Sequence, residues 1–580
     1  MVGKKNNTET VNAKKYTKQE VITSLVLSLA VLVLLNVVAS FFYLRFDLTS
    51  EKRYSLSTST KALVKGLKDE VVVKVYLAGD LPAGFVRLKE SAKDILNEMR
   101  AVNRSAIHFE FYDPLEGKTE AEKKDVIDEL RKQGLTATNL TTQGKDANTQ
   151  RIIVPGAIVT YAGQSFPVQL LESQAGFSPE EILNNSVIQL EYKFTNAIKK
   201  LSQYRQPRVA FLQGNGELNR LDLADILNTL IAQRYQVQEL NLDSTFAIPS
   251  RFDALVIAKP RVAFDEKQKY KIDQYIMRGG NVLWLLDATT ADMDSLKENL
   301  TGQFVVDRDL NLEDQLFKYG VRINGDLVQD INLCGAIPLV IGNLGNSPQT
   351  QLFPWFYAPY LISNNNHAIN RNLDPVAAQF ASTIDTIKNI GIRKTILLNT
   401  TDNSKAVRTP ARVNFGIVAD RPDPRYFNQK NLPVAVLLEG NFQSVFKNRL
   451  APEFLAVNDS LEDLKFLAEG KQAKQIVIAD GDIIRNEKRN DNSAYPLGYQ
   501  PFTRQTLANK DFMLNSIEYL ADNAGLLETR NKEVKLRLLD STKVNEYKTK
   551  LQLLNVVLPM LITALAGLVF TYWRRKRYAS

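Results

Sequence analysis

The segment VAFLQGNGELNR, residues 209–220, decides the fold class, because an apolar run meets two glycines just before a helical stretch opens. Open α/β sheets bind ligands at such turns, at the carboxyl ends of their strands. A dinucleotide-binding fingerprint needs G-x-G-x-x-G, and Asn219 stands where the third glycine is required. The segment is therefore either a strand-to-helix turn that needs two flexible residues, or a loop that binds a polar ligand through Gly214, Asn215 and Gly216.

The chain on either side of this turn alternates apolar strands with helices over residues 205–528. Such alternation is typical of a parallel sheet that is covered on both faces. The runs TILLNT (395–400), PVAVLLEG (433–440) and KQIVIADGDII (474–484) are expected to extend the same sheet. The predicted strands are 207–213, 236–242, 252–260 and 281–287, and the predicted helices are 220–235, 264–280 and 509–525. Lys259 and Asp287 lie at predicted strand ends, so we expect them beside the Gly214–Gly216 loop in a ligand cleft.

A smaller α/β region is predicted over residues 45–204. Its order, β-α-β-α-β-β-α, is that of a thioredoxin-like domain. In redox thioredoxins a C-x-x-C pair follows the first strand, but GDLPAGF (79–85) stands there and contains no cysteine. We therefore expect a scaffold and not an oxidoreductase. The predicted strands are 70–78, 105–114, 151–161 and 165–172, and the predicted helices are 85–102, 119–133 and 179–202.

Two uncharged apolar stretches, residues 21–44 and 551–573, are each long enough to cross a bilayer as a helix. Five lysines against two glutamates in residues 1–20, and the basic tail RRKR in 574–580, flank their outer ends. By the positive-inside rule both termini are cytoplasmic. Residues 45–550, including a polar juxtamembrane segment at 529–550, are then exported across the inner membrane. A cleaved signal peptide is the alternative for the first stretch, but its apolar core is longer than signal peptides need.

Composition excludes several classes of protein. The formal net charge of +9 is concentrated at the two ends beside the apolar stretches, which argues for membrane lipid and against nucleic acid as a partner. One cysteine, Cys334, permits no intramolecular disulfide, and with only two histidines a His/Cys metal site is not expected. GKT at 117–119 lacks the upstream glycine of a P-loop, so the chain is expected to have neither an ATPase site nor a cofactor.

The sequence offers few residues in the arrangements that catalysis needs. A nucleophile elbow would place Cys or Ser after the strand at 281–287, but Asp287 stands there. The carboxylate pair Asp480 and Asp482 keeps open an alternative, an exported hydrolase. The usual interpretation of such acids at strand ends is caps and turns.

An aromatic cluster lies in LFPWFYAPYLI, residues 352–362. Aromatic side chains anchor protein partners and also fill cores, so a partner-binding patch and a core strand are both open. The residues concerned are Trp355, Phe356, Tyr357 and Tyr360.

Several segments together resemble the gliding-motility-associated ABC transporter auxiliary (substrate-binding) proteins of Bacteroidetes, the GldG family. They are LTSEKRYSLSTSTKALV (48–64), VKVYLAGDLPAGFVRLKESAKDIL (73–96), VAFLQGNGE (209–217), DLVQDINLCGAIPL (326–339) and KDFMLNSIEYLAD (510–522). The resemblance implies a role beside a membrane permease and a cytoplasmic ATPase, in gliding and linked surface secretion. It also implies that the second region is similar to class I glutamine amidotransferase-like domains that lack the nucleophile. The family supplies no catalytic residues.

The sequence therefore predicts a non-enzymatic, two-pass inner-membrane subunit whose exported region is a binding or coupling module for an unidentified periplasmic ligand. A structural, force-transmitting scaffold of the cell envelope and the exported hydrolase are the alternatives.

Overall fold

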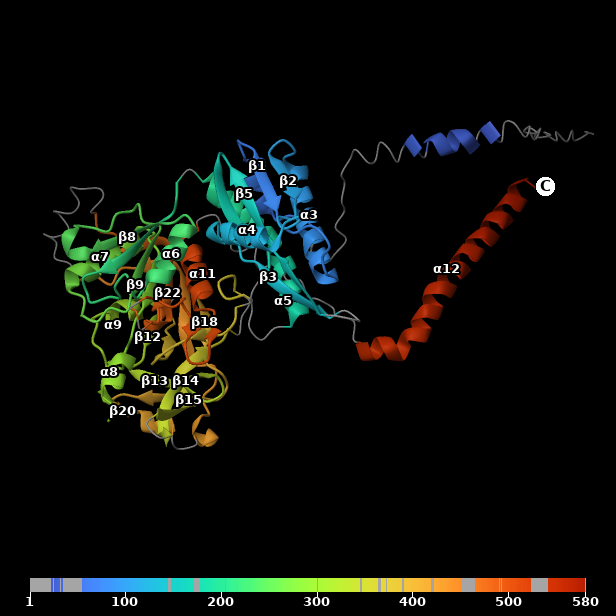
Figure 1. Cartoon of the computed structure of the whole chain (residues 1–580). Helices are drawn as coiled ribbons and strands as arrows, with labels where there is room; N and C mark the ends of the chain where they lie inside the picture. The colour runs from blue at the N-terminus through green and yellow to red at the C-terminus, as the bar shows by residue number, and fades with distance from the viewer. Residues whose placement is uncertain are drawn as a thin grey trace, which may run out of the picture. The chain divides into compact units, whose positions relative to one another are not determined.

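The computed structural model describes residues 55–522 with short gaps, together with residues 541–578 and parts of 22–34. The gaps are at 144–147, 172–177, 204, 300, 345–346, 364–366, 372, 389–390, 419–421, 450–464, 490 and 492. The chain divides into two compact units, Met1–Lys532 and Glu533–Ser580. The first unit holds two α/β regions, and the second consists mainly of one long helix (Figure 1).

The first α/β region is built on a four-stranded sheet in the order β2-β1-β5-β6. β1 and β2 are parallel, whereas β5 is antiparallel to both β1 and β6. A polar hairpin, β3–β4, precedes β5, and the sequence predicts no strand for β3 or for the first half of β4. The strands are β1 (Val71–Val75), β2 (Ile107–Phe111), β3 (Thr138–Gln143), β4 (Asn148–Ile153), β5 (Gly156–Tyr161) and β6 (Gln164–Gln169).

The helices of this region begin at side-chain caps. Ser57 caps α2 (Thr58–Lys65), while Thr119 and Ser178 form capping boxes at α4 (Glu120–Lys132) and α5 (Pro179–Ser202). α2, α3 (Ala83–Val102) and α5 share one core with the sheet, and Leu130 of α4 packs in a second cluster with Ile158 of β5. Helices therefore cover both faces of the sheet. The predicted helices are present, and so are the predicted strands, except that the strand expected at 151–161 is divided into the end of β4 and β5, which belong to different sheets.

The second α/β region is organised by a seven-stranded sheet in the order β18-β21-β22-β10-β9-β7-β8. The five strands from β22 to β8 are parallel, and β21 and β18 continue the sheet in antiparallel fashion. The three apolar runs that were expected to extend the sheet do so as β18, β21 and β22. The strands are β7 (Arg208–Gln213), β8 (Gln236–Asn241), β9 (Ala254–Ala258), β10 (Val282–Leu285), β18 (Ile392–Asn399), β21 (Pro433–Gln443) and β22 (Glu469–Ile478).

Alternate residues of each parallel strand enter different cores. Val209 and Phe211 of β7 pack with α6 (Ala224–Ala232) and α11 (Asn509–Ala521). Ala210 and Leu212 pack on the opposite face, with α7 (Glu266–Met277) and α9 (Glu313–Tyr319). Figure 1 shows the central strands lying between these two helix pairs. The sheet is buried on both faces, as its nearly continuous apolar strands indicate.

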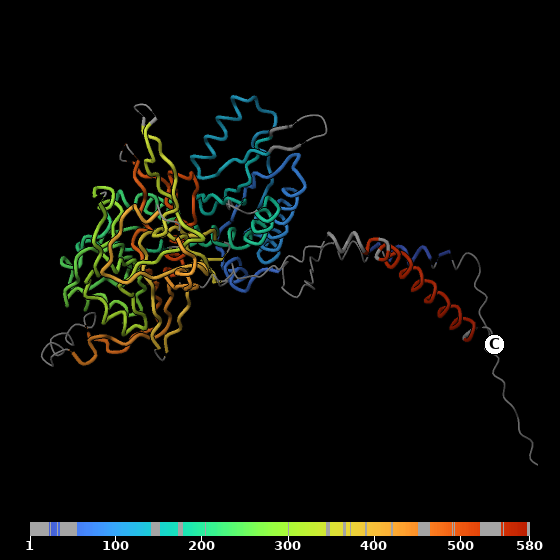
Figure 2. Tube along the Cα trace, turned by 90° about the horizontal axis from the view of Figure 1, so that it is seen from below, coloured from blue at the N-terminus to red at the C-terminus, as the bar shows by residue number. Residues whose placement is uncertain are grey.

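An insertion between α9 and β21, which excludes β18, packs with α8 (Met293–Glu298) and β11 (Gln303–Val305) around a small separate core. Short strand pairs and the long hairpin of β14 (Cys334–Leu344) and β15 (Ser347–Leu361) form the insertion, and Figure 2 shows this hairpin in yellow, extending away from the body. The core contains Trp355 and Tyr357 together with Phe380. The remaining strands are β12 (Val321–Ile323), β13 (Asp326–Asp330), β16 (Val376–Ala377), β17 (Ile384–Thr386), β19 (Ser404–Arg408) and β20 (Ala411–Val413); β23 (Tyr499–Gln500) and β24 (Gln505–Thr506) follow later.

Charged groups join α5 to α11 within the first unit. Lys199 Nζ lies 2.6 Å from Asp522, and Lys200 Nζ lies 3.6 Å from Glu518, which also accepts a hydrogen bond from the Tyr192 hydroxyl. These side chains are largely buried, so buried ion pairs join α5 to α11.

The second unit contains α12 (Ser541–Tyr578), with Pro559 in its interior. Within the described residues, one segment is long and apolar enough to cross a membrane, Gln552–Lys576, and it has a mean hydropathy of 2.3. Most of the first predicted span, residues 21–44, lies outside the described residues, and the described parts of 22–34 are helical.

Candidate functional site

Loops that follow four parallel strands meet at the carboxyl edge of the large sheet. Gly214 follows β7, Lys259 follows β9, Asp287 lies two residues after β10, and Asp480 lies two residues after β22. All five predicted ligand residues, Gly214, Asn215, Gly216, Lys259 and Asp287, therefore belong to loops at this edge. Asp480 and Asp482, which the sequence suggested separately as a carboxylate pair, join Lys259 and Asp287 there.

Lys259 is the centre of this cluster. Its side chain is 1% exposed, and its backbone has a φ of 54°, in the left-handed region that side chains other than glycine rarely adopt. Nζ donates to Asp482 Oδ2 at 2.5 Å and lies 3.2 Å from Asp287 Oδ2 and 3.9 Å from Asp292 Oδ2. Burial by itself lowers the pKa of this ammonium, but the carboxylates of Asp287 and Asp482 outweigh it and raise the pKa above its ordinary value. Lys259 is therefore a permanent buried cation.

Gly481 makes the close approach of two loops feasible. A Cβ at this position would lie 2.5 Å from Cβ of Lys259 and 3.0 Å from its Cα. The Gly481 N–H donates to Asp287 Oδ1 at 2.7 Å, which connects the loop after β22 to the loop after β10. The sequence ADGD (479–482) is thus a turn whose glycine is required by packing.

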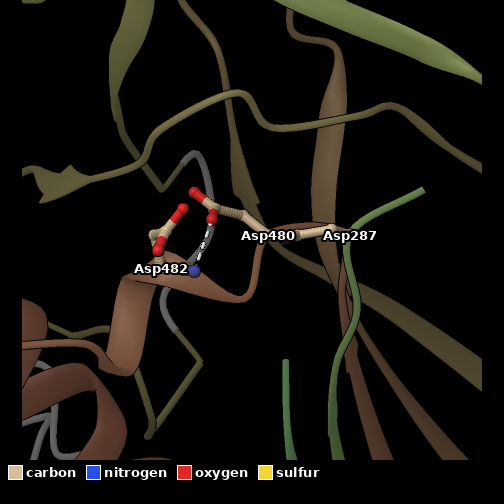
Figure 3. Close-up of side chains that lie close together, drawn as sticks. All are labelled: Asp287, Asp480 and Asp482. Atoms are coloured by element: carbon tan, nitrogen blue, oxygen red, sulfur yellow. Dashed lines mark hydrogen bonds between the residues drawn. The ribbon is translucent and has the colours of Figure 1, made fainter. Parts of the chain in front are cut away.

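Asp480 differs in its surroundings from the other two carboxylates of the cluster, Asp287 and Asp482. Asp480 is fully buried and accepts hydrogen bonds from the backbone N–H groups of Gln379 at 2.6 Å and Asp482 at 2.7 Å. Figure 3 shows the second of these bonds, with Asp480 and Asp482 on one loop and Asp287 on another strand end. Burial, followed by the charges of Asp482 and Asp287, raises the pKa of Asp480 well above its ordinary value. Asp480 is therefore protonated well above the pH at which an exposed aspartate ionises.

Counter-ions surround the charged carboxylates from two sides. Asp482 lies between Lys259 and Arg485, whose guanidinium is 3.5 Å from Oδ1 and also forms a 2.5 Å ion pair with Asp294. Arg261 pairs with Asp292 at 3.6 Å. Carboxylate oxygens of Asp287, Asp480 and Asp482 lie within 4.8 Å of one another, the spacing of a cation site, but the Lys259 ammonium is bound to two of these carboxylates. A divalent ion would have to compete with it.

Other residues of the chain supply hydrogen-bond partners to Asn215, in the loop of Gly214, Asn215 and Gly216. The Asn215 N–H donates to the Glu217 carboxylate at 2.8 Å, and the Asn215 side chain is buried, donating to Gln268 at 3.0 Å. Burial raises the pKa of Glu217, and backbone N–H groups of the loop oppose that rise. Gly214 and Gly216 have φ of 128° and 76°, which the turn interpretation explains. Ligand binding by this loop remains a prediction, and an anion there would have to displace Glu217.

The predicted aromatic patch lies inside the molecule. Trp355, Phe356, Tyr357 and Tyr360 of β15 are at most 7% exposed, so the core interpretation explains their placement and partner docking through them gains no support. Cys334 is partly exposed, and burial raises the pKa of its thiol to about 11, which keeps it protonated at neutral pH.

A cavity of about 360 Å³ adjoins the cluster and was missed by sequence reasoning. Asp482 and Arg485 line it where it meets the sheet, and its other walls come mainly from α8, from the β14–β15 hairpin and from residues 487–489 and 495–502. The hairpin and the loop at 485–502 are more than 100 residues apart in sequence, and this loop contains no periodic pattern. No local signal in the sequence therefore predicts the cavity.

Comparison with known families accounts for most of the second region. A family model described as an ABC-type uncharacterized transport system, ABC_transp_aux, matches residues 206–516. The chain belongs to this family of ABC transport auxiliary proteins. It is thus an accessory component of an ABC transport system, which fits its candidate membrane helix. Residues 50–160 match a domain of unknown function, DUF7088.

One solved structure, titled "mmIFT52 N-terminal domain", is similar over 54% of this chain and 98% of that chain, with 13% identity and a TM-score of 0.29. A likeness of this size carries no argument about function. No match is found among curated protein sequences.

Proposed function

We propose that this auxiliary protein is a non-catalytic, membrane-anchored subunit of an ABC transporter complex of the gliding-motility type, as in the GldG family of Bacteroidetes. The single observation that carries the proposal is the family match over residues 206–516, and α12 at the C-terminus fits it. Its partners would be a permease, which α12 contacts in the bilayer, and a cytoplasmic ATPase. The exported region would act as a binding or coupling module.

The two α/β regions fit the fold expectations on which this role rests. The sheet order β2-β1-β5-β6, in which β5 alone runs against the other three strands, supports a thioredoxin-like scaffold. The five parallel strands of the large sheet, with helices on both faces, support an amidotransferase-like domain. Asp287 follows the strand on which such a domain would carry its nucleophile, and it binds Lys259 instead.

The geometry of the acidic cluster favours binding or coupling over hydrolysis. A hydrolytic pair needs one free carboxylate base and an acid that reaches the substrate. Asp482 is bound by Lys259 and Arg485, and both oxygens of Asp480 accept backbone hydrogen bonds. We therefore assign the cluster a structural role, in which it fixes the loops at the carboxyl edge of the sheet.

The proposed topology places both termini in the cytoplasm and residues 45–550 in the periplasm. The basic tail after α12 supports this orientation, because positively charged flanks are retained on the cytoplasmic side. The membrane span that the sequence predicts at residues 21–44 would complete the two-pass anchor.

Co-purification in mild detergent tests the proposal. The tagged full-length chain is compared with a variant that lacks residues 551–580, and co-purifying proteins are identified by mass spectrometry. We expect a permease and an ATPase with the full-length chain and their loss from the variant. Recovery of the full-length chain without either protein would contradict the proposal.

A further inference from the structure

The cavity beside the acidic cluster has the dimensions of a small-molecule site. Its volume of about 360 Å³ lies in the range of roughly 300–1,000 Å³ that is usual for ligand pockets. Pockets of this kind combine apolar walls with a few polar groups that orient the ligand. Both kinds of group are present here.

Cations outnumber carboxylates in the lining. The cations are Lys297, Arg485, Lys488 and Arg489, and the acids are Asp482 and Glu487. Arg485 is bound to Asp294 and Lys488 lies 3.0 Å from Asp222, so these two are partly neutralised. In the described part of the chain Lys297 and Arg489 form no direct ion pair and interact with Asp294 and Asp491 only at longer range, so both can donate to an anion.

Aromatic rings form the wall beside these cations. Tyr495 and Tyr499 stack with their centroids 5.0 Å apart and an interplanar angle of 25°. The Arg489 guanidinium lies 4.6 Å from the centroid of the Tyr495 ring, and Phe502 is 52% exposed at the same cavity. A flat apolar group can pack against such rings while its charged substituent reaches the arginine.

Trp355 adds an unpaired donor to this cavity. Its side chain is 1% exposed, and its indole Nε1–H has no hydrogen-bond partner among the described residues. A buried donor without an acceptor costs about 1–3 kcal/mol, so the Trp355 N–H calls for an acceptor that the described residues do not supply. An oxygen atom of a ligand would satisfy it.

We propose that the cavity between the β14–β15 hairpin and residues 485–502 binds a small ring-bearing organic anion, with its phosphate or carboxylate at Arg489 and Lys297. The ring packs against Tyr499 and Phe502, and a ligand oxygen accepts from Trp355. This inference rests on the binding role within the proposed function, and it is tested on the purified chain without transporter partners. Failure of binding is therefore distinguishable from failure of co-purification.

Isothermal titration calorimetry of the full-length chain in detergent provides the test. Phenyl phosphate is the probe, inorganic phosphate lacks the ring, and benzyl alcohol lacks the charge. We expect saturable binding of phenyl phosphate and at least about tenfold weaker binding of each of the other two. Absence of saturable phenyl phosphate binding overturns the proposal, and so does equal affinity for inorganic phosphate, which would make the aromatic wall irrelevant.

Matched variants locate the site. Arg489→Gln and Lys297→Gln should each weaken phenyl phosphate binding by about tenfold, because a charge-assisted hydrogen bond is lost. Arg425→Gln is the control, since Arg425 is exposed and outside this cavity, where it pairs with Asp423. Trp355→Phe keeps an aromatic ring and removes only the N–H, and we expect weaker binding. Equal affinity in Arg489→Gln, Lys297→Gln and Arg425→Gln would place the anion elsewhere and overturn the proposal.

Discussion

At the scale of single residues, Lys259 determines whether the carboxyl edge of the sheet is stable. Asp287 is buried and Asp482 is partly buried, and the ammonium of Lys259 is a counter-ion to both carboxylates. Lys259→Met removes the charge while keeping most of the side-chain volume. Because an unpaired buried charge is costly, we expect a loss of about 3–5 kcal/mol in the free energy of unfolding.

Urea denaturation of the full-length chain, followed by tryptophan fluorescence, measures this loss, since Trp284 lies in β10. Lys267→Met is the control, because Lys267 is exposed on α7. Similar midpoints for the two variants would show that Lys259 is not the counter-ion of the cluster.

The protonation of Asp480 predicts a pH dependence of known sign. Its pKa is raised in the folded chain above the value of 3.8 of the free side chain, so the folded state retains the proton over the window between the two values. In that window the native state binds more protons than the unfolded state, and stability falls as pH rises. Asp480→Asn cannot lose a proton, so the stability of the wild type relative to this variant should decrease with rising pH.

Parallel urea titrations between about pH 4 and pH 8 measure this difference, whose slope is limited to about 1.4 kcal/mol per pH unit. Asp491→Asn is the control, because hydrogen bonds from Ser493 lower the pKa of Asp491 at the surface, so its difference curve should change only below about pH 4 and stay flat over this range. A difference curve for Asp480→Asn that is flat or rises with pH would contradict a retained proton.

The sequence indicates part of this site for a clear physical reason. Lys259 and Asp287 come at the ends of apolar strands, and the ends of parallel strands share one edge of the sheet. The central position of Lys259 could not be predicted, because it depends on a left-handed backbone and on the contact with Gly481. The left-handed backbone of Lys259 and its contact with Gly481 depend on the tertiary fold, in which β9 and β22 lie on either side of β10.

At the scale of elements, the loop after β22 must pack directly on the loop after β9. Gly481→Ala would put a methyl group 2.5 Å from Cβ, 2.6 Å from Cγ and 3.0 Å from Cα of Lys259, atoms at the base of that side chain and not at its flexible end. We expect a loss of about 1–3 kcal/mol, the usual cost of overpacking. The φ of Gly481 is −82°, so the loss would come from steric contact and not from backbone strain.

The same denaturation assay compares Gly481→Ala with Gly342→Ala, where a Cβ would meet no atom within 4 Å. Equal stability of these variants would show that the two loops are not in contact.

Elements with long apolar runs are predictable from this sequence, and short polar elements are not. β18, β21 and β22 were expected because Val, Ile and Leu dominate them. The β3–β4 hairpin is rich in Thr, Asn and Gln, and the insertion contains strands of two to five residues such as β16 and β13. Such strands are too short to show a period, so tertiary packing around Trp355 and Phe380 determines their structure.

At the scale of the whole molecule, the proposed topology predicts which side of the membrane each part faces. In a Cys334→Ala background, Ser250→Cys lies on an exposed surface of the second α/β region, and Ser580→Cys marks the C-terminus. A membrane-impermeant maleimide added to cells with a permeabilised outer membrane should label the first variant only. Labelling of Ser580→Cys without lysis would contradict a cytoplasmic C-terminus.

Exchange of the membrane helix tests whether α12 joins this chain to a transporter. Residues 552–573 are replaced by an unrelated apolar span of equal length, so that the chain stays anchored and only the lipid-facing sequence changes. We predict that the wild-type chain co-purifies with a permease and an ATPase and that the exchanged chain recovers far less of both. Recovery of neither protein with the wild-type chain would contradict the account.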